Sequence, residues 1–445
     1  MKTSKEETPA GVAATPSQAG EALRQKWSWV EPTVWTDRML MALENGVEGG
    51  KWFRWSDKVE SERNLRSGFQ AVRRNDGGCG VDRQSVRGFE ARLEMEIKRL
   101  QEQLHNETYR PQPVLRGYIE KPGSREKRPL GIPAVRDRTV QGALRNVMEP
   151  ICEREFAEHS YGFRPGRGCR EALRRVETLL KEGATWVVDA DLKSYFDTIP
   201  HDLLMERVRE RVADGRVLRL VEAYLQAGVM EGMKGWQPTE RGTPQGAVIS
   251  PLLANLYLNP LDHLRSQRGV EMVRYADDFV LLCHSEQAAR AALEIVAQWV
   301  EGAGLTLHPE KTRIVDATQR GGFDFLGYHF ERGKKWPRRK SLQKLKEKLR
   351  PMTQRNNGKC LHAVLAKINP ILRGWYGYFR YSKSNTFVAV DGWVRGRLRG
   401  ILRKRMKRCG RARGTDHQRW PNAYFERHGL FSLMRAWQSL RQSHV

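Results

Sequence analysis

The spacing of apolar residues divides the chain into helices and short strands. Residues 60–75 and 86–106 carry apolar positions three and four apart, which predicts two helices on either side of a glycine-rich loop at 75–82. Residues 114–133 consist of a strand-like run, a basic Pro-Gly turn and a second run, which predicts a β-hairpin. The N-terminus lacks the apolar core of a secretory signal, and we expect roughly the first 20 residues to be a disordered tail.

The middle of the chain alternates helices with strands and hairpins, which predicts an α+β fold with an antiparallel sheet. From residue 341 onward the chain is basic and helical, and we expect Ser341 to be the N-cap of the first helix there. The other expected helices lie at 137–156, within 161–183, at 201–227, within 242–262 and at 287–307, and the expected strands lie at 186–192, 228–241, 273–283 and 323–333.

Charge is concentrated in one part of the 445-residue chain. Residues 331–413 contain 26 Lys and Arg against three acids, so this segment holds +23 of a total net charge of +26. Such a basic face predicts a polyanionic partner, although a solvated basic surface would look similar. The chain contains no run of 18 apolar residues, so we expect no membrane span and no membrane partner. The six scattered cysteines form no C-x-x-C pair, which favours reduced thiols over a zinc module.

The segment VRYADDFVLL, residues 273–282, places two adjacent acids in an otherwise strand-like run. Its apolar residues favour a half-buried strand, whereas neighbouring buried carboxylates repel each other. Two compatible explanations exist for Asp277 and Asp278. They lie in the tight turn of a hairpin, because Asp tolerates turn geometry, or a divalent cation holds both of them ionised.

A second pair of acids lies in the strand VVDADL, where Asp189 and Asp191 share one face. Asp189 could simply be a charge at the entry of the strand. If this strand neighbours the 273–283 hairpin, then Asp191, Asp277 and Asp278 converge at one edge of a sheet. Three carboxylates there would form a two-metal site for phosphoryl transfer, and Mg²⁺ is the natural ion for oxygen ligands.

Several of these segments resemble a known family. VVDADLKSYFDTIPH, RGTPQGAVISPLLANLYL and VRYADDFVLL resemble, in order and spacing, the palm motifs of reverse transcriptases. KRPLGIPAVRDRTVQGALRNVMEPICEREF, SYGFRPGRGC and NPILRGWYGYFR resemble group II intron-encoded reverse transcriptase/maturases, and the likeness extends between residues 60 and 430. The resemblance implies a right-hand polymerase, with α+β fingers and an antiparallel palm sheet followed by an all-α basic thumb/maturase domain.

The resemblance also implies roles for the palm residues. Asp191 and Asp277 would bind two Mg²⁺ ions, with Asp278 beside them. Phe196 would be a steric gate, whose ring clashes with the 2′-hydroxyl of a ribonucleotide so that DNA is made; the alternative is an ordinary core aromatic. Gln245 would lie beside the incoming nucleotide and the template, in a loop that could equally be a plain turn before a helix.

Basic residues receive roles in the same way. Lys121 and Arg128 would reach the triphosphate of the incoming dNTP, unless they are solvated hairpin charges. The C-terminal basic segment would hold the duplex and the intron RNA, and cations cover nearly all faces of GRLRGILRKRMKRCGRAR. The cations assigned to RNA contact are Arg403, Lys404, Arg405, Lys407 and Arg408. Trp375, Tyr376, Tyr378 and Phe379 could stack on bases, but helical spacing favours core positions for Trp375 and Phe379.

The resulting domain prediction has four parts. We expect a partly disordered leader at 1–58, an N-terminal extension and the start of the fingers at 59–113, the rest of the fingers and the palm at 114–330, and the thumb/maturase domain at 331–445. Without paired cysteines near its end, the chain is not expected to carry the endonuclease of many relatives.

The implied function is an RNA-directed DNA polymerase that also assists splicing and mobility of its intron. Its expected partners are group II intron RNA, an RNA template with a DNA primer, target DNA and dNTPs, in the bacterial cytosol or on the nucleoid. Two alternatives remain open. One is a splicing maturase with a dispensable polymerase, and the other is a domesticated reverse transcriptase in defence or repair.

Overall fold

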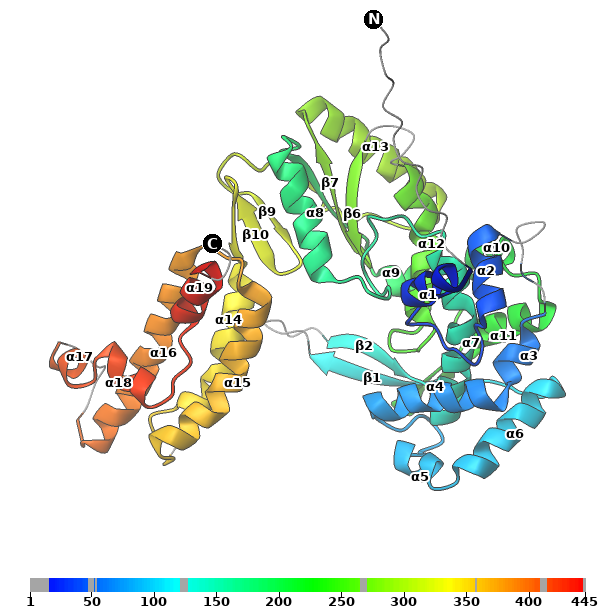
Figure 1. Cartoon of the computed structure of the whole chain (residues 1–445), viewed down its shortest axis with the longest axis horizontal. Coiled ribbons are helices and arrows are strands. Elements are labelled where there is room, and N and C mark those ends of the chain that lie inside the picture. The colour runs from blue at the N-terminus through cyan, green and yellow to red at the C-terminus, as the bar shows by residue number, and fades with distance from the viewer. Residues whose placement is uncertain are drawn as a thin grey trace, which may run out of the picture.

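The computed structural model describes residues 16–46, 52, 54–120, 127–264, 270–356, 358–408 and 414–442. It is built around three small sheets (Figure 1). In that view the palm sheet lies at the top, the fingers sheet lies below it, and the thumb helices lie to the left. No helix in the described ranges is both long and apolar enough to cross a membrane.

The palm sheet has the strand order β6-β7-β3-β8, and every neighbouring pair is antiparallel. Alternate residues of its strands enter two different cores, because helices cover both faces. Val187 and Val280 pack with α8 on one face, whereas Val188 and Leu281 share a core with α13 on the other. The elements are β3 (Trp186–Asp191), β6 (Glu271–Tyr275), β7 (Asp278–Cys283), β8 (Arg313–Asp316), α8 (Cys169–Lys181) and α13 (Glu286–Gly302).

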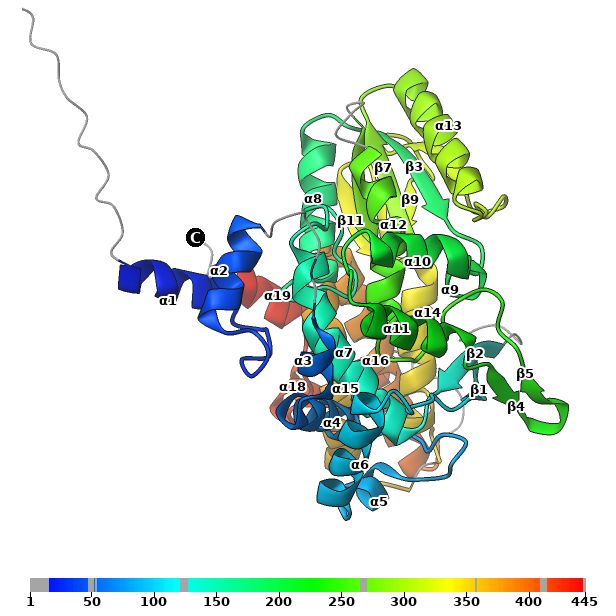
Figure 2. The same cartoon turned by 90° about the vertical axis from the view of Figure 1, so that its right-hand side faces the viewer.

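The fingers sheet joins the two hairpins that the sequence predicts at 114–133 and 228–241. Its order is β2-β1-β4-β5, with β1 and β4 parallel and the other pairs antiparallel. Figure 2 shows the β4–β5 hairpin projecting from this region. The strands are β1 (Val114–Glu120), β2 (Lys127–Ile132), β4 (Val229–Glu231) and β5 (Gly235–Gln237), with a 3-10 turn at Gly232–Lys234 between the last two.

Two helices cross tightly behind the fingers. α4 (Glu62–Asn75) lies on α7 (Val135–Glu153) where Gly68 meets Gly142. A Cβ atom at Gly68 would lie 2.4 Å from the carbonyl oxygen of Thr139, so only glycine permits this approach. The N-terminal extension is therefore packed directly on the fingers.

Two expected helices are each divided in the structure. The segment 86–106 forms α5 (Val86–Glu90) and α6 (Leu93–His105), and the segment 201–227 forms α10 (His201–Arg209) and α11 (Gly215–Gln226). Asp214 separates the latter pair because its Oδ1 accepts hydrogen bonds from the first backbone N–H groups of α11. The short α9 (Tyr195–Thr198) and the apolar α12 (Ser250–Leu264) complete the palm.

The expectation of a disordered tail of roughly 20 residues is wrong for its last part. The chain forms α1 (Pro16–Lys26), α2 (Asp37–Asn45) and α3 (Ser56–Glu60), which the sequence pattern did not reveal. Figure 2 shows α1 projecting from the body of the protein. Trp35 anchors the segment, since its ring is fully buried and its Nε1 donates to the carbonyl oxygen of Asn146 at 2.9 Å.

A small antiparallel sheet connects palm and thumb. It consists of β9 (Phe323–Phe325), β10 (Tyr328–Glu331) and β11 (Lys334–Pro337), so the boundary proposed between residues 330 and 331 falls inside β10. Its Phe323 and Tyr328 share a core with Phe379 of the thumb. The thumb contains α14 (Arg339–Leu349), a 3-10 turn (Pro351–Thr353), α15 (Leu361–Phe379), α16 (Ser384–Arg405), α17 (Thr415–Arg419), α18 (Asn422–Arg427) and α19 (Leu433–Gln442).

Ser341 is not the N-cap of the first thumb helix. α14 begins two residues earlier, at Arg339, with Arg338 in the capping position. The Ser341 hydroxyl donates instead to the carbonyl oxygen of Gly327, at 3.0 Å. The side chain thus ties α14 to the small sheet, a long-range contact that local sequence does not encode.

Candidate active site

The predicted acids meet at the end of β3. Antiparallel pairing of β3 with β7 sets Asp191 opposite Asp278. β6 turns back into β7 through Ala276 and Asp277, since Tyr275 pairs with Asp278. The tight turn expected from the sequence is confirmed, and it presents Asp277 next to the paired acids.

Burial and the charges of neighbouring carboxylates raise the pKa values of Asp189, Asp277 and Asp278. Burial first, and then the charges of neighbouring carboxylates, raise the pKa of Asp278 to about 7. Burial also raises the pKa of Asp277, and the charge of Asp191 adds to that rise. Burial raises the pKa of Asp189 to about 6. Crowded carboxylates of this kind are the ligands that a hard divalent cation stabilises.

The ligand type therefore suits magnesium, but cationic side chains partly neutralise the cluster. Within the described ranges, no three acids, thiols or imidazoles already stand at metal-ligand spacing. The ammonium of Lys311 forms an ion pair with Oδ2 of Asp191. Arg313 donates from Nε to Oδ2 of Asp189 at 3.3 Å. A cation bound by Asp191 would compete with Lys311.

The sequence pattern does not predict Lys311 as a site residue. The chain that follows α13 is hydrogen-bonded to the end of β3, because the backbone N–H of His308 donates to the carbonyl oxygen of Asp191 at 2.8 Å. Lys193 likewise donates from its backbone to Thr306 at 2.9 Å. A lone lysine before a short strand carries no signal of its own, so only the tertiary fold reveals its position.

A buried polar network supports the Ala276-Asp277 turn. The guanidinium of Arg274 is fully buried and forms an ion pair with Asp262 of α12. Its Nη1 donates to Asn255 Oδ1 at 3.0 Å and to the carbonyl oxygen of Ala276 at 2.9 Å. Ala276 itself has a φ of +60°, a left-handed conformation that costs energy for a residue with a side chain. Arg274 was also missed, because a single Arg in a strand predicts an exposed position.

The predicted gate, Phe196, lies on α9, with its side chain half-buried. It lines a pocket of about 410 Å³ together with Arg116 and Pro129 of the fingers. Arg128 is exposed on β2, and its positive charge opposes the rise that burial causes in the pKa of Asp277. Lys121 lies outside the described residues.

Gln245 lies in the loop between the fingers and α12. Its carbonyl oxygen accepts a hydrogen bond from the backbone N–H of Gly131 on β2, at 2.6 Å. The next residue, Gly246, has a φ of +112°, and a Cβ atom there would lie 2.5 Å from the Gly131 carbonyl oxygen. The loop is therefore a close crossing of β2 that requires glycine, and it holds Gln245 at the junction of fingers and palm.

The cations assigned to RNA contact have different environments. Arg403 forms an ion pair with the fully buried Asp416, at 2.5 Å. Arg405 donates to the carbonyl oxygen of Lys359, whereas the side chains of Lys404, Lys407 and Arg408 are exposed. The expectation that cations cover nearly all faces of the segment 396–413 is wrong for its first part, where α16 buries Leu398, Arg399, Gly400, Ile401 and Leu402.

The four aromatic residues of α15 contribute to cores. Phe379 is buried, and Trp375 packs against the same cluster, which confirms the core positions favoured by helical spacing. Tyr376 packs on the thumb core. Tyr378 is half-buried, and its hydroxyl donates to the carbonyl oxygen of Leu326 at 2.7 Å. In this structure these rings stabilise the thumb and its junction with the palm.

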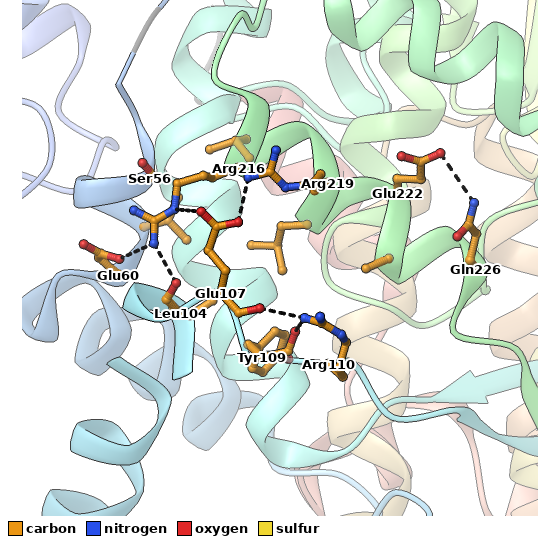
Figure 3. Close-up of a pocket in the computed structure, with 14 residues that line it drawn as sticks. Ser56, Glu60, Leu104, Glu107, Tyr109, Arg110, Arg216, Arg219, Glu222 and Gln226 are labelled. Atoms are coloured by element: carbon orange, nitrogen blue, oxygen red, sulfur yellow. Dashed lines mark hydrogen bonds and ion pairs between the residues drawn. The ribbon is translucent and has the colours of Figure 1, made fainter. Parts of the chain in front are cut away.

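A second pocket of similar volume, about 400 Å³, lies elsewhere, between α3, α6 and α11 (Figure 3). None of the candidate site residues lines it. Arg216 points between Glu60 and Glu107, and Arg219 also pairs with Glu107. These four charges therefore satisfy one another.

Comparison with known proteins agrees with the geometry. Residues 119–330 match the family "Reverse transcriptase (RNA-dependent DNA polymerase)", and residues 342–420 match "Group II intron, maturase-specific domain". Protein YkfC of Escherichia coli K12 is 38% identical over 293 residues, a match that covers 57% of this chain and 76% of YkfC.

Group II intron-encoded protein LtrA of Lactococcus lactis subsp. cremoris is 39% identical over 196 residues. That match covers 44% of this chain but only 32% of LtrA. Among solved structures, a chain of the "Partial Cas6-RT-Cas1--Cas2 complex" has 22% identity and a TM-score of 0.36 over 55% of this chain and 42% of that chain, a likeness too weak to add to the assignment. With both family matches in order along one polypeptide, the chain belongs to the group II intron-encoded reverse transcriptase/maturases and is an RNA-directed DNA polymerase.

Proposed function

We propose that the palm edge copies RNA into cDNA by two-metal phosphoryl transfer, with Asp191, Asp277 and Asp278 as ligands of two Mg²⁺ ions. When bound, such ions activate the primer 3′-hydroxyl and neutralise charge on the transferred phosphoryl group. The observation that carries the proposal is the β3–β7 register, which pairs Asp191 with Asp278 beside the turn that holds Asp277.

The surrounding side chains would select and orient the nucleotide. Arg128, near enough to Asp277 for their charges to interact, would neutralise the triphosphate together with Lys121. Phe196 would exclude a ribose 2′-hydroxyl, and Gln245 would lie beside the templating base pair. The pocket that Phe196 shares with the fingers supports this arrangement, because it opens between the two subdomains that would enclose a nucleotide.

The partners we propose are an RNA template with a DNA primer, dNTPs, group II intron RNA and target DNA. The maturase-specific match at 342–420 supports binding of intron RNA, and the segment that contains it carries most of the net charge. We propose the bacterial cytosol as the location of this activity, with the protein on the nucleoid when it is bound to DNA. The same match also supports a second candidate, a splicing maturase whose polymerase is dispensable.

A parallel assay separates the two candidates. The protein is purified with its flanking intron RNA, and primer extension and splicing are measured on one preparation. Asp277→Ala should reduce primer extension more than about a hundredfold. Replacing a residue that only hydrogen-bonds to a metal ligand already lowers activity by about 10–100-fold, and the loss of a ligand itself should cost more. RNA binding and residual splicing assistance should persist, because the basic thumb is separate from the acids.

The matched control is Asp316→Asn at the opposite end of the same sheet, where Asp316 pairs with Trp186. This variant should extend primers normally. Extension by Asp277→Ala at the wild-type rate would exclude the two-metal assignment. Splicing without any extension by the wild-type protein would favour the maturase alternative.

A further inference from the structure

An exposed aromatic ring lies beside the candidate gate and has no role in the scheme above. Phe163 belongs to the loop before α8, and its side chain is 45% exposed, unusual for a phenylalanine. Its ring meets Phe196 edge-on, with centroids 6.3 Å apart and planes at 80°. It also lies 6.5 Å from the ring of Tyr275, the residue that precedes the Ala276-Asp277 turn.

The backbone of Phe163 is strained and firmly held. Its φ is +59°, a left-handed conformation that disfavours a bulky side chain and suits Gly or Asn. On one side Gly162 is pressed against the turn, since a Cβ atom there would lie 2.2 Å from the Ala276 nitrogen. On the other side the buried Arg164 donates to Glu153 from Nη2 at 2.7 Å. The loop therefore directs the Phe163 ring at the gate despite the strain.

The gate ring depends on few aromatic neighbours. Among the residues described, Phe196 meets two other rings, those of Tyr195 and Phe163. Tyr195 is fixed in the core, because its hydroxyl donates to the Ala254 carbonyl oxygen at 2.6 Å and its ring is buried. Phe163 supports the gate from the solvent side, where Tyr195 does not reach.

We propose that Phe163 is a specificity-determining residue, which acts by holding the ring of Phe196 in the orientation that excludes a ribose 2′-hydroxyl. Without the edge-on contact, the half-buried Phe196 ring gains rotamer freedom and yields space to the hydroxyl. This inference rests on the proposed role of Phe196 as the gate. Phe163 itself is a positioning residue, since its ring acts through Phe196 and not on the substrate.

The test compares kcat/KM for a dNTP and its matching ribonucleotide on one template and primer. Phe163→Asn should lower the preference for the dNTP about three- to tenfold, which is the change in kcat/KM ratio that corresponds to the loss of one aromatic contact. Phe163→Tyr keeps the ring and should keep the preference. Because Asn tolerates a positive φ, Phe163→Asn should unfold at the same temperature as the wild type or higher, whereas a purely structural role would make it less stable. Phe163→Leu, which keeps apolar bulk, provides a second measurement if Asn perturbs the loop.

Two further variants distinguish the failure of this inference from the failure of the gate. Phe196→Val alone should lower the preference, and adding Phe163→Asn to it should have no further effect, because the two rings act as one unit. An unchanged preference in Phe196→Val overturns the gate itself. A changed preference there, with an unchanged one in both Phe163→Asn and Phe163→Leu, overturns only the role of Phe163. A further loss in the double variant shows that Phe163 acts independently of Phe196 and also overturns the proposal.

Discussion

Arg274 donates from Nε to Oδ1 of Asp262 at 2.7 Å, and the two side chains are 0% and 4% exposed. The pair joins β6 to α12 in the interior of the palm. The same guanidinium caps the carbonyl oxygen of Ala276, the residue before Asp277. A buried salt bridge is weak evidence for stability, but it is well suited to fixing one geometry. Here that geometry is the position of a proposed metal ligand.

The first prediction concerns this pair. Arg274→Met should lower the free energy of unfolding by about 3–5 kcal/mol, because it leaves the Asp262 carboxylate buried without its partner. Adding Asp262→Leu should recover much of the stability, since the uncompensated charge is removed. Primer extension should stay impaired in the double variant, because the Ala276 carbonyl still lacks its donor. Urea unfolding and primer extension measure the two effects.

Arg290→Gln is a suitable control. Arg290 pairs with Glu286 on the surface of α13, with side chains 70% and 44% exposed, and its loss should cost less than about 1 kcal/mol. Wild-type extension by the Arg274→Met/Asp262→Leu double variant would show that the turn keeps its geometry without the guanidinium.

Much of the palm is predictable from local sequence. The 273–283 hairpin combines strand-forming residues with an acidic turn, and its paired strands appear as expected, from Glu271–Tyr275 into Asp278–Cys283. The convergence of Asp191 with Asp278 follows once their strands are assumed to be neighbours. Local propensity and the tertiary fold agree here, because each strand is buried by the residues that define its pattern.

The missed features depend on contacts between distant segments. Arg274 and Lys311 look like ordinary basic residues until the fold brings them to Asp262 and Asp191. Arg403 belongs to a run of cations that predicts an exposed surface. In the structure it forms an ion pair with the buried Asp416, which the local sequence does not reveal. Burial of a charge is decided by its partner, and the spacing of neighbouring residues carries no information about that partner.

The second prediction concerns the gate. Phe196→Val should let ribonucleotides compete with dNTPs about tenfold better or more, because the ring that clashes with the 2′-hydroxyl is gone while the carboxylates are untouched. The measurement is the ratio of kcat/KM values for the two sugars. An equal ratio in wild type and variant would make Phe196 an ordinary core aromatic, which was the alternative from its sequence.

The third prediction concerns pH and magnesium. The pKa of Asp278 is about 7 in the folded chain, against about 3.9 for an unfolded aspartate. As pH rises from 4 to 7, the unfolded state loses this proton before the folded state does. The free energy of unfolding therefore falls progressively over this range, and above pH 7 the loss stays constant. Asp278→Asn should therefore gain stability over the wild type between pH 4 and 7 in the absence of metal.

Magnesium should reverse this effect, because it binds the ionised carboxylates. The rise in Tm on adding MgCl₂ should be larger at pH 8 than at pH 5 in the wild type, and it should shrink in Asp278→Asn. Thermal unfolding of both proteins at the two pH values is the measurement. A stability difference between them that does not change with pH would mean that Asp278 titrates as an exposed carboxyl.

The last prediction concerns the basic end of α16, where binding of RNA phosphates and simple solvation are the two explanations. Lys404, Lys407 and Arg408 are exposed, so replacing all three with Gln should leave the fold intact. If they contact phosphates, the slope of log K against log salt for intron RNA should flatten by about two units, since each neutralised phosphate contributes roughly 0.7–0.9. Extension of a short primer should change less, because the palm carries out the chemistry.

Arg403→Gln is the matched contrast: its ion pair with the buried Asp416 predicts a loss of stability with little change in slope. An unchanged slope in the triple variant would assign these cations to solvent, and the RNA surface would then lie elsewhere in the basic segment 331–400.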